Sequence, residues 1–128
     1  MTIFALSTAN GIAGLAVIRV SGHLALTALK TLSRKSYFEP NVMTRTNFYD
    51  PNTSELIDKG LAVFFARPNS FTGEDVVEIH IHGGISTVNL ALKALGSIDQ
   101  LRLAEPGEFS KRAFINNKMD LTAIEAMG

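Results

Sequence analysis

The sequence contains no cysteine and no long run of apolar or basic residues, and each absence excludes a class of protein. Without cysteine the chain cannot be a disulfide scaffold, a thiolate zinc site or an enzyme with a thiol nucleophile. No apolar run approaches the ~20 residues that a membrane-spanning helix requires, and no basic and apolar leader opens the chain. The 12 basic and 12 acidic residues are interspersed, which argues against a strong stand-alone nucleic-acid surface. We therefore expect a cytoplasmic protein that does not contact a membrane.

Three motifs of nucleotide-binding and hydrolytic enzymes are also missing from the sequence. It contains no G-x-x-x-x-G-K-[ST] phosphate loop and no G-x-S-x-G nucleophile elbow. The segment Gly11-Ile12-Ala13-Gly14 is too short for a dinucleotide fingerprint and lacks its third glycine. These 128 residues are therefore not expected to hydrolyse a nucleotide by themselves.

The residues that are present predict one α+β domain. A chain of 128 residues that is 46% hydrophobic is long enough to bury a core. Residue patterns predict strands at 3–7, 15–20, 47–50, 57–66, 76–82 and 101–104, helices at 24–32, 85–95 and 108–116, and an irregular segment at 37–47. We expect a mixed, largely antiparallel sheet flanked by helices. A further helix begins at Asp120 but has only about two turns, shorter than the ~11 residues typical of a helix. We therefore expect residues 1–119 to form this domain and residues 120–128 to start a helical domain of a longer protein.

The strand predicted at 76–82 carries ionisable side chains on one face. Apolar and polar residues alternate there, so successive side chains point to opposite sides of the sheet. The set expected in the core is Val77, Ile79 and Ile81, and the set expected on the opposite face is Glu78, His80 and His82. A fold does not need the second set, which makes that face the candidate site.

Arg19 lies in a run apolar enough to be a central strand, where a guanidinium needs an anionic partner. One interpretation is an internal ion pair with Glu78, and the other is a ligand held by both. A carboxylate accepts two parallel N–H bonds, which suits the amino group and ring N–H of a pterin. Arg19 and Lys118 would then hold oxygens along the rest of the ligand. Phe71, beside the polar face, is the aromatic residue best placed to stack on a planar heterocycle.

A metal site is the alternative reading of the same strand, because a carboxylate and two imidazoles at alternate positions can face one ion. The sequence offers no second group of ligands, which makes this alternative weaker. Gly83 and Gly84 after His82 allow close backbone approach to a ligand, although a strand-to-helix turn explains them equally well.

Residues near the end of the chain are expected to have structural roles. Phe109 and Phe114 are expected in the core. Glu108 and Arg112, four positions apart on a helix, are expected to form a surface ion pair worth about 0.3 kcal/mol.

Several blocks of residues together carry a family resemblance. They are I-R-V-S-G at 18–22, N-S-F-T-G-E-D at 69–75, H-G-G at 82–84, P-G-E-F-S-K-R-A-F at 106–114, N-K-M-D-L at 117–121 and Glu125-Ala126. In this order and spacing the sequence resembles the N-terminal domain of the tRNA-modification GTPases of the MnmE (TrmE) family. The resemblance covers essentially the whole chain, and the N-S-F-T-G-E-D and P-G-E-F blocks are its most specific parts.

The resemblance implies functions beyond those that the residue pattern indicates. Family members continue into a helical domain and a G domain that hydrolyses GTP with magnesium and potassium. With an FAD-dependent partner of the MnmG type, they add an aminomethyl or carboxymethylaminomethyl group at carbon 5 of the wobble uridine of tRNA. The N-terminal domain is similar to the tetrahydrofolate-binding domain of aminomethyltransferases and forms a homodimer. It binds 5-formyl- or 5,10-methylene-tetrahydrofolate through positions that fall on Arg19, Glu78 and Lys118, with His82 to Gly84 and Phe71 as expected pocket lining.

The sequence departs from the family pattern at two places. Members usually carry Gly-Arg-Gly in the first turn, where this chain has residues 11–14 without arginine, and Glu105 stands where arginine is commoner. These changes leave open an alternative, a structural dimerisation module with a degenerate folate pocket. The least favoured alternative is a small metalloenzyme built on Glu78, His80 and His82.

Overall fold

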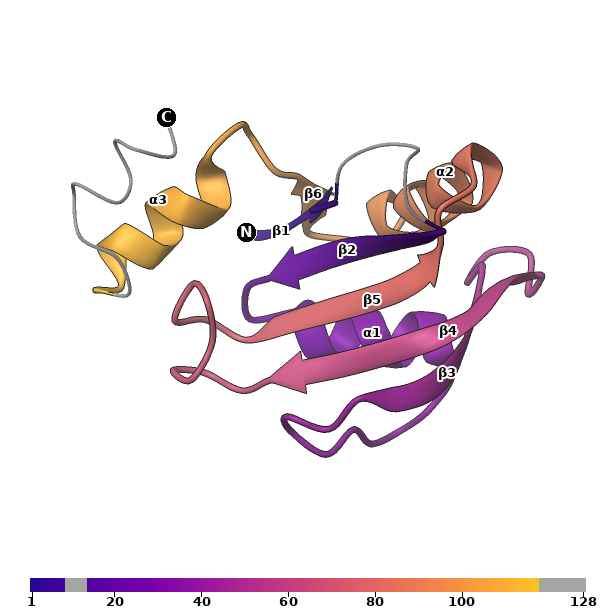
Figure 1. Cartoon of the computed structure of the whole chain (residues 1–128), viewed down its shortest axis with the longest axis horizontal. Coiled ribbons are helices and arrows are strands. Elements are labelled where there is room, and N and C mark those ends of the chain that lie inside the picture. Colours follow the sequence, from indigo (N-terminus) through magenta and orange to yellow (C-terminus); the bar gives the residue numbers. More distant parts are fainter. Residues whose placement is uncertain (9–13, 118–128) are drawn as a thin grey trace.

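The computed structural model describes residues 1–8 and 14–117, which form one six-stranded sheet and three helices (Figure 1). The elements are β1 (Thr2–Leu6), β2 (Leu15–Ser21), α1 (Ala25–Ser33), β3 (Thr44–Tyr49), β4 (Leu56–Phe65), β5 (Val76–His82), α2 (Ile85–Gly96), β6 (Leu101–Leu103) and α3 (Glu108–Ile115). Most of the glycine turn predicted at 10–14, together with Lys118 and the helix expected from Asp120, lies outside the described residues.

The sheet is mixed and largely antiparallel, as the sequence predicted. Its strand order is β3-β4-β5-β2-β1-β6, and only the β1–β6 pair is parallel. β2 and β5 lie at the centre and pair along their whole length, from Leu15 opposite His82 to Ser21 opposite Val76. This register puts Arg19 directly opposite Glu78.

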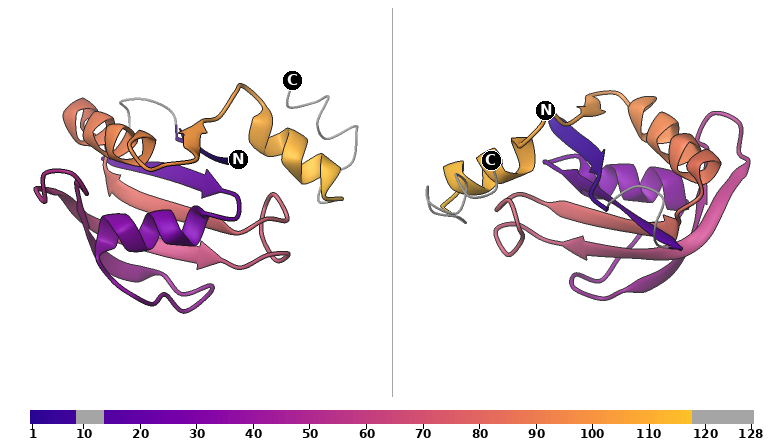
Figure 2. Two further views of the ribbon diagram at one scale, coloured as in Figure 1. Left: turned by 180° about the vertical axis from the view of Figure 1, so that it is seen from behind. Right: turned by 45° about the horizontal axis from the view of Figure 1, so that its top comes forward.

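The core lies between the sheet and α1 and α2. Figure 1 views the sheet from the face opposite α1, and the left view of Figure 2 shows α1 in front of the strands. Helical spacing turns the apolar side chains of both helices toward the sheet. The fully or almost fully buried residues include Ile18, Val20, Ala28, Leu29, Leu32, Val77, Ile79, Ile81, Ala91 and Leu95. Burial of the apolar residues of β5 confirms the alternation predicted for that strand.

α3 lies apart from this layer, at the end of the sheet where β1 begins (Figure 1). Ala113 is its one buried residue. Arg112 of α3 instead donates to the Met1 carbonyl oxygen, and Asn116, the C-cap of α3, donates to that of Thr72 in the loop between β4 and β5. Polar contacts therefore fix the position of α3.

β3 begins earlier than predicted, at Thr44, inside the segment expected to be irregular. Its alternation was hard to recognise because one of its two buried positions holds Thr46 and only the other, Phe48, is apolar. Arg45 and Asn47 point to the opposite face and are exposed. Within the described part of the chain, no helix is long and apolar enough to cross a membrane.

Gly60 allows β4 and β5 to approach closely. A Cβ atom at this position would lie 2.0 Å from the carbonyl oxygen of His80, so no other residue fits without moving a strand. The following residue, Leu61, lies opposite His80 in the β4–β5 register. Gly60 thus allows the close β4–β5 pairing that places Leu61 beside His80 on the face that α1 leaves open.

Candidate functional site

The open face of the sheet, opposite α1, carries the ionisable residues of β5. In its central row Val63 of β4, Glu78 of β5 and Arg19 of β2 lie side by side. The side chains of Arg19 and Glu78 are 24% and 22% exposed, so solvent or a ligand can reach both. The pattern of β5 therefore placed Glu78 on the correct face.

Glu78 uses both carboxylate oxygens in long contacts. Arg19 Nη2 lies 3.3 Å from Oε2, and His80 Nε2 lies 3.3 Å from Oε1. The internal ion pair that the sequence suggested is therefore present. Hydrogen bonds to charged groups are commonly 2.7–2.9 Å, so neither contact has the geometry of a strong one. The carboxylate remains available to a better-aligned donor.

The Arg19 guanidinium lies between two aromatic rings. Its central carbon is 4.9 Å from the centroid of the Phe71 ring and 5.9 Å from that of Phe109. Its Nε–H is buried and has no hydrogen-bond partner among the described residues. A buried donor without an acceptor is costly and rare, and it calls for an explanation such as an absent ligand. Arg19 thus has unused capacity to donate to an oxygen.

A hollow of about 430 Å³ opens beside Glu78. It is lined by Phe65, Asn69, Ser70, Phe71, Val76 and Glu78. The volume lies in the range of small-molecule sites, and the lining combines an apolar wall with few polar groups, as such sites commonly do. Two of the residues expected in the site, Glu78 and Phe71, line this hollow. Arg19, the third, forms an ion pair with Glu78.

The N-S-F-T-G-E-D segment forms the loop that carries Phe71. Ser21 Oγ lies 2.7 Å from Thr72 Oγ1 and from Glu74 Oε1, which ties the loop to β2. Ser70 Oγ donates to the carbonyl oxygen of Glu74 and accepts from the N–H of Gly73. Phe71 is 38% exposed. The polar residues of the segment therefore fix the loop, and Phe71 is left facing the hollow.

α3 is attached through a network of ion pairs rather than a single surface pair. Arg112 lies 3.0 Å from Glu74 and 3.4 Å from Glu108, and Arg112 and Glu108 are only 15% and 14% exposed. The shortest contacts of Glu108 are with Arg102, at 2.6 and 2.7 Å in a two-pronged geometry. The predicted Glu108–Arg112 pair is therefore present, but it is largely buried rather than on the surface, and partners distant in sequence bind both residues more closely. This network holds Phe109 beside Arg19.

The Glu108 carboxylate makes the stability of the domain depend on pH. Hydrogen bonds from Arg102 hold the pKa of Glu108 at about 2, below its usual value of 4.5. Because the folded-state pKa is the lower one, this carboxylate stabilises the fold above pH 4.5, and the contribution is lost as the pH falls toward about 2. We expect Glu108→Gln to be less stable than the wild type at neutral pH, with the difference narrowing across this interval. Urea unfolding at several pH values measures it, and a constant difference would contradict the prediction.

The remaining predicted site residues lie elsewhere. His82 is at the far end of β5 with its side chain 70% exposed, and its backbone N–H and Nδ1 both lie 2.8–2.9 Å from Asp58 Oδ2. Burial alone would raise the pKa of Asp58, but these His82 contacts bring it below its usual value. Gly84 is the N-cap of α2 and Gly83 bonds to Gly14, so both form the strand-to-helix turn. Neither lines the hollow beside Glu78.

The structure does not favour the metal alternative. His80 contacts Glu78 whereas His82 contacts Asp58, so the side chains of β5 are divided between two sites. Residues 1–8 and 14–117 contain no group of three or more histidine or acidic side chains arranged to hold an ion.

The sequence did not predict two parts of the site, Phe109 and the ion-pair network around Arg112. Phe109 was expected in the core but is half-buried beside Arg19. Phe114, also expected in the core, is 41% exposed. The one sequence signal for the position of Phe109 was Gly107, because a glycine can adopt the left-handed conformation, with φ of 75°, that it has at the start of α3. This conformation turns the next residues back toward β2. The network around Arg112 had no local signal, because its partners are far apart in sequence.

The fold and the hollow define a small α+β domain with a ligand-sized pocket on the open face of a mixed sheet. Comparison with known proteins gives its family: a sequence profile described as "GTP-binding protein TrmE N-terminus" matches residues 2–118, and the chain belongs to this family.

Full-length relatives carry the same domain. The chain is 52% identical over 126 residues to the tRNA modification GTPase MnmE of Parvibaculum lavamentivorans, covering 98% of this chain and 29% of the relative. It is also 52% identical to MnmE of Rickettsia typhi, over 98% of this chain and 28% of that protein. The mitochondrial tRNA modification GTPase gtpbp3 of Dictyostelium discoideum is 48% identical over 98% of this chain and 26% of its own length. The chain thus spans less than a third of the curated relatives it matches.

Proposed function

We propose that this chain is the folate-binding, dimerising N-terminal domain of a tRNA-modification GTPase. Its ligand would be 5-formyl- or 5,10-methylene-tetrahydrofolate, with the pterin in the hollow beside Glu78. The observation that carries the proposal is the pairing of a partly exposed carboxylate with an arginine whose buried Nε–H lacks an acceptor among the described residues.

The described residues fit the chemistry of a reduced folate. Glu78 offers two acceptor oxygens to the amino group and ring N–H of the pterin. Arg19 offers donors to the oxygens of the ligand, and Phe71 and Phe109 offer apolar and aromatic surface to its rings. Lys118, the third residue expected from the family resemblance, lies outside the described residues. When bound, the folate supplies a one-carbon unit, and the role of this chain's residues is to hold and orient it.

The proposal extends to the longer protein that the relatives represent. Their printed names describe tRNA modification GTPases, and this supports the same activity for the protein that contains this chain. GTP, magnesium and potassium would bind to a G domain outside these residues. The assembled enzyme would be a cytoplasmic homodimer that acts with an FAD-dependent MnmG-type protein on carbon 5 of the wobble uridine of tRNA.

Calorimetric titration with 5-formyl-tetrahydrofolate tests the proposal. We expect saturable binding to the full-length protein, because the hollow, Glu78 and Arg19 are all accessible in the described part of the domain. A titration in 1 M salt should retain most of the affinity, since a half-buried carboxylate is screened less than a surface one. Absence of heat and of binding, in a preparation shown by sedimentation to be a folded dimer, would contradict the proposal and favour the structural module with a degenerate pocket.

A further inference from the structure

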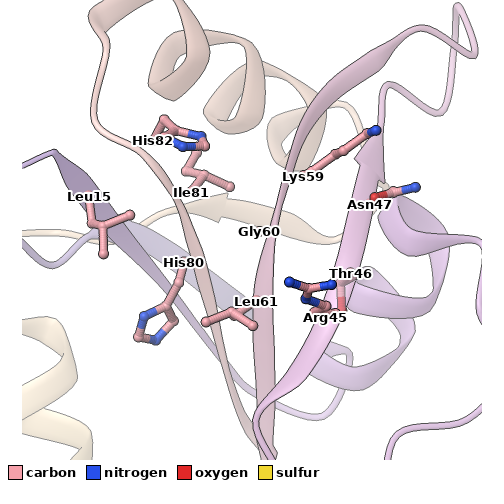
Figure 3. Close-up of a pocket in the computed structure, with 10 residues that line it drawn as sticks. All are labelled: Leu15, Arg45, Thr46, Asn47, Lys59, Gly60, Leu61, His80, Ile81 and His82. Atoms are coloured by element: carbon pink, nitrogen blue, oxygen red, sulfur yellow. The ribbon is translucent and has the colours of Figure 1, made fainter.

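A second hollow, of about 520 Å³, lies on the same open face and is not explained by the pterin site (Figure 3). Its lining residues come from β2, β3, β4 and β5, which meet on this face. Leu15 and Leu61 supply apolar surface and are 57% and 37% exposed. Arg45 and Lys59 bring two positive charges to its lining. The hollow therefore suits a ligand that is part apolar and part anionic.

Both cations are unpaired within residues 1–8 and 14–117. Among the described residues, neither the Arg45 guanidinium nor the Lys59 ammonium has a hydrogen-bond or ion-pair partner; the bond to Arg45 from Lys35 goes to its carbonyl oxygen. By contrast, Arg19, Arg102 and Arg112 all pair with glutamates. In Figure 3 the Arg45 guanidinium is turned back toward Leu61, and Lys59 extends beside Asn47. Two cations at one hollow, both unpaired in the described part of the chain, favour an anionic ligand.

The two hollows are neighbours on one continuous surface. Arg45, Leu61 and His80 form a row across β3, β4 and β5, and the adjacent row contains Val63 and Glu78. His80 belongs to both, because it lines the second hollow and contacts Glu78 at 3.3 Å. From strand spacing and rise, the Cα atoms of Glu78 and Arg45 are about 12 Å apart. This is within the length of an extended folate, which joins a pterin through an aminobenzoyl group to one or more glutamates.

We propose that Arg45 and Lys59 bind the carboxylates of the glutamyl tail of the folate and make the site prefer polyglutamylated folates. The inference rests on the proposed function, since it requires the pterin beside Glu78. The tail crosses the row of His80 and Leu61, with the aminobenzoyl ring on the leucine surface and the carboxylates at Arg45 and Lys59. Each glutamate after the first adds a carboxylate without adding apolar surface, so the preference comes from charge.

Titration of the full-length protein with 5-formyl-tetrahydrofolate carrying one or five glutamates tests this inference. We expect the pentaglutamate to bind the wild type about tenfold more tightly, the effect of one additional charge-assisted contact. Arg45→Ala, and more strongly Arg45→Ala with Lys59→Ala, should reduce the ratio of the two affinities to near one. Raising the salt concentration should shrink the wild-type ratio, because exposed charges are screened.

Lys93→Ala is the matched control, because it removes an exposed positive charge from α2. It should leave the pentaglutamate-to-monoglutamate ratio unchanged. Equal affinities of the wild type for both folates would overturn the inference and leave the pterin site intact. If neither folate bound, both the proposed function and this inference would be overturned. If the double variant still preferred the pentaglutamate, the glutamyl tail would bind elsewhere, and the inference about Arg45 and Lys59 would also be overturned.

Discussion

Glu78→Ala is expected to abolish folate binding, with a loss of affinity of about 100-fold or more. The substitution removes both acceptor oxygens for the pterin edge, and truncating one partner of a hydrogen-bonded charge pair in a ligand site typically costs about 2–5 kcal/mol. At 1.4 kcal/mol per factor of ten, a cost of about 2.8 kcal/mol, in the lower half of that range, corresponds to about 100-fold. Calorimetric titration with 5-formyl-tetrahydrofolate measures the loss directly.

The same variant should retain its fold. Glu78 lies on the open face, and its contacts with Arg19 and His80 are long and partly exposed, so the free energy of unfolding should fall by about 1 kcal/mol or less. Glu55→Ala, which removes an exposed acidic side chain from the turn before β4, is the control and should change neither quantity. Near-wild-type affinity of Glu78→Ala would refute the role of Glu78. An unfolded variant would mean that the Arg19–Glu78 pair is structural.

The placement of Glu78 was accessible from sequence because a strand has a strict two-residue period. Once Val77, Ile79 and Ile81 are in the core, the residues between them must face away. Arg19 followed from similar reasoning, since a charge in an apolar strand needs a partner. What sequence did not supply was the register, which fixes Arg19 opposite Glu78 rather than one position away. Burial of one face specifies register only after strand neighbours are known.

The aromatic contacts on Arg19 were not predictable to the same extent. Phe71 and Phe109 reach it from a loop and from α3, two segments with no periodic pattern that orients them. Their positions depend on the bonds of Ser21, Glu74 and Arg112. Such contacts join residues far apart in the chain, so they follow from the completed fold. The early part of β3 was missed for a simpler reason, the threonine at its buried position.

The residues of the N-S-F-T-G-E-D loop have mainly structural roles, although this segment is one of the most specific parts of the family resemblance. Its first three residues line the hollow, and its last four form hydrogen bonds that hold the loop. The two acidic side chains have partners within the protein. Glu74 pairs with Arg112, and Asp75 accepts from the backbone N–H of Arg67. The residues of this motif thus build the loop, whereas Glu78 and Arg19 supply the charged groups of the proposed site.

Arg112→Ala should be the most destabilising single change in the network that attaches α3. It removes contacts with Glu74, Glu108 and the carbonyl oxygens of Met1 and Ser21. Breaking a largely buried ion pair typically costs about 3–5 kcal/mol, and the partial exposure of Glu74 and the remaining Arg102–Glu108 pair reduce this to about 2–3 kcal/mol. Urea unfolding measures the difference.

Folate affinity of the same variant tests whether the network also supports the site. Loosening α3 moves Phe109 away from Arg19, and we expect binding to weaken by about tenfold, the equivalent of 1.4 kcal/mol. Lys111→Ala is the matched control, because it removes a positive charge from the adjacent, exposed position of α3. If Arg112→Ala lost no more stability than Lys111→Ala, the ion pairs would not anchor the helix. Lost stability with unchanged folate affinity would show that the network anchors α3 without positioning Phe109 for the ligand.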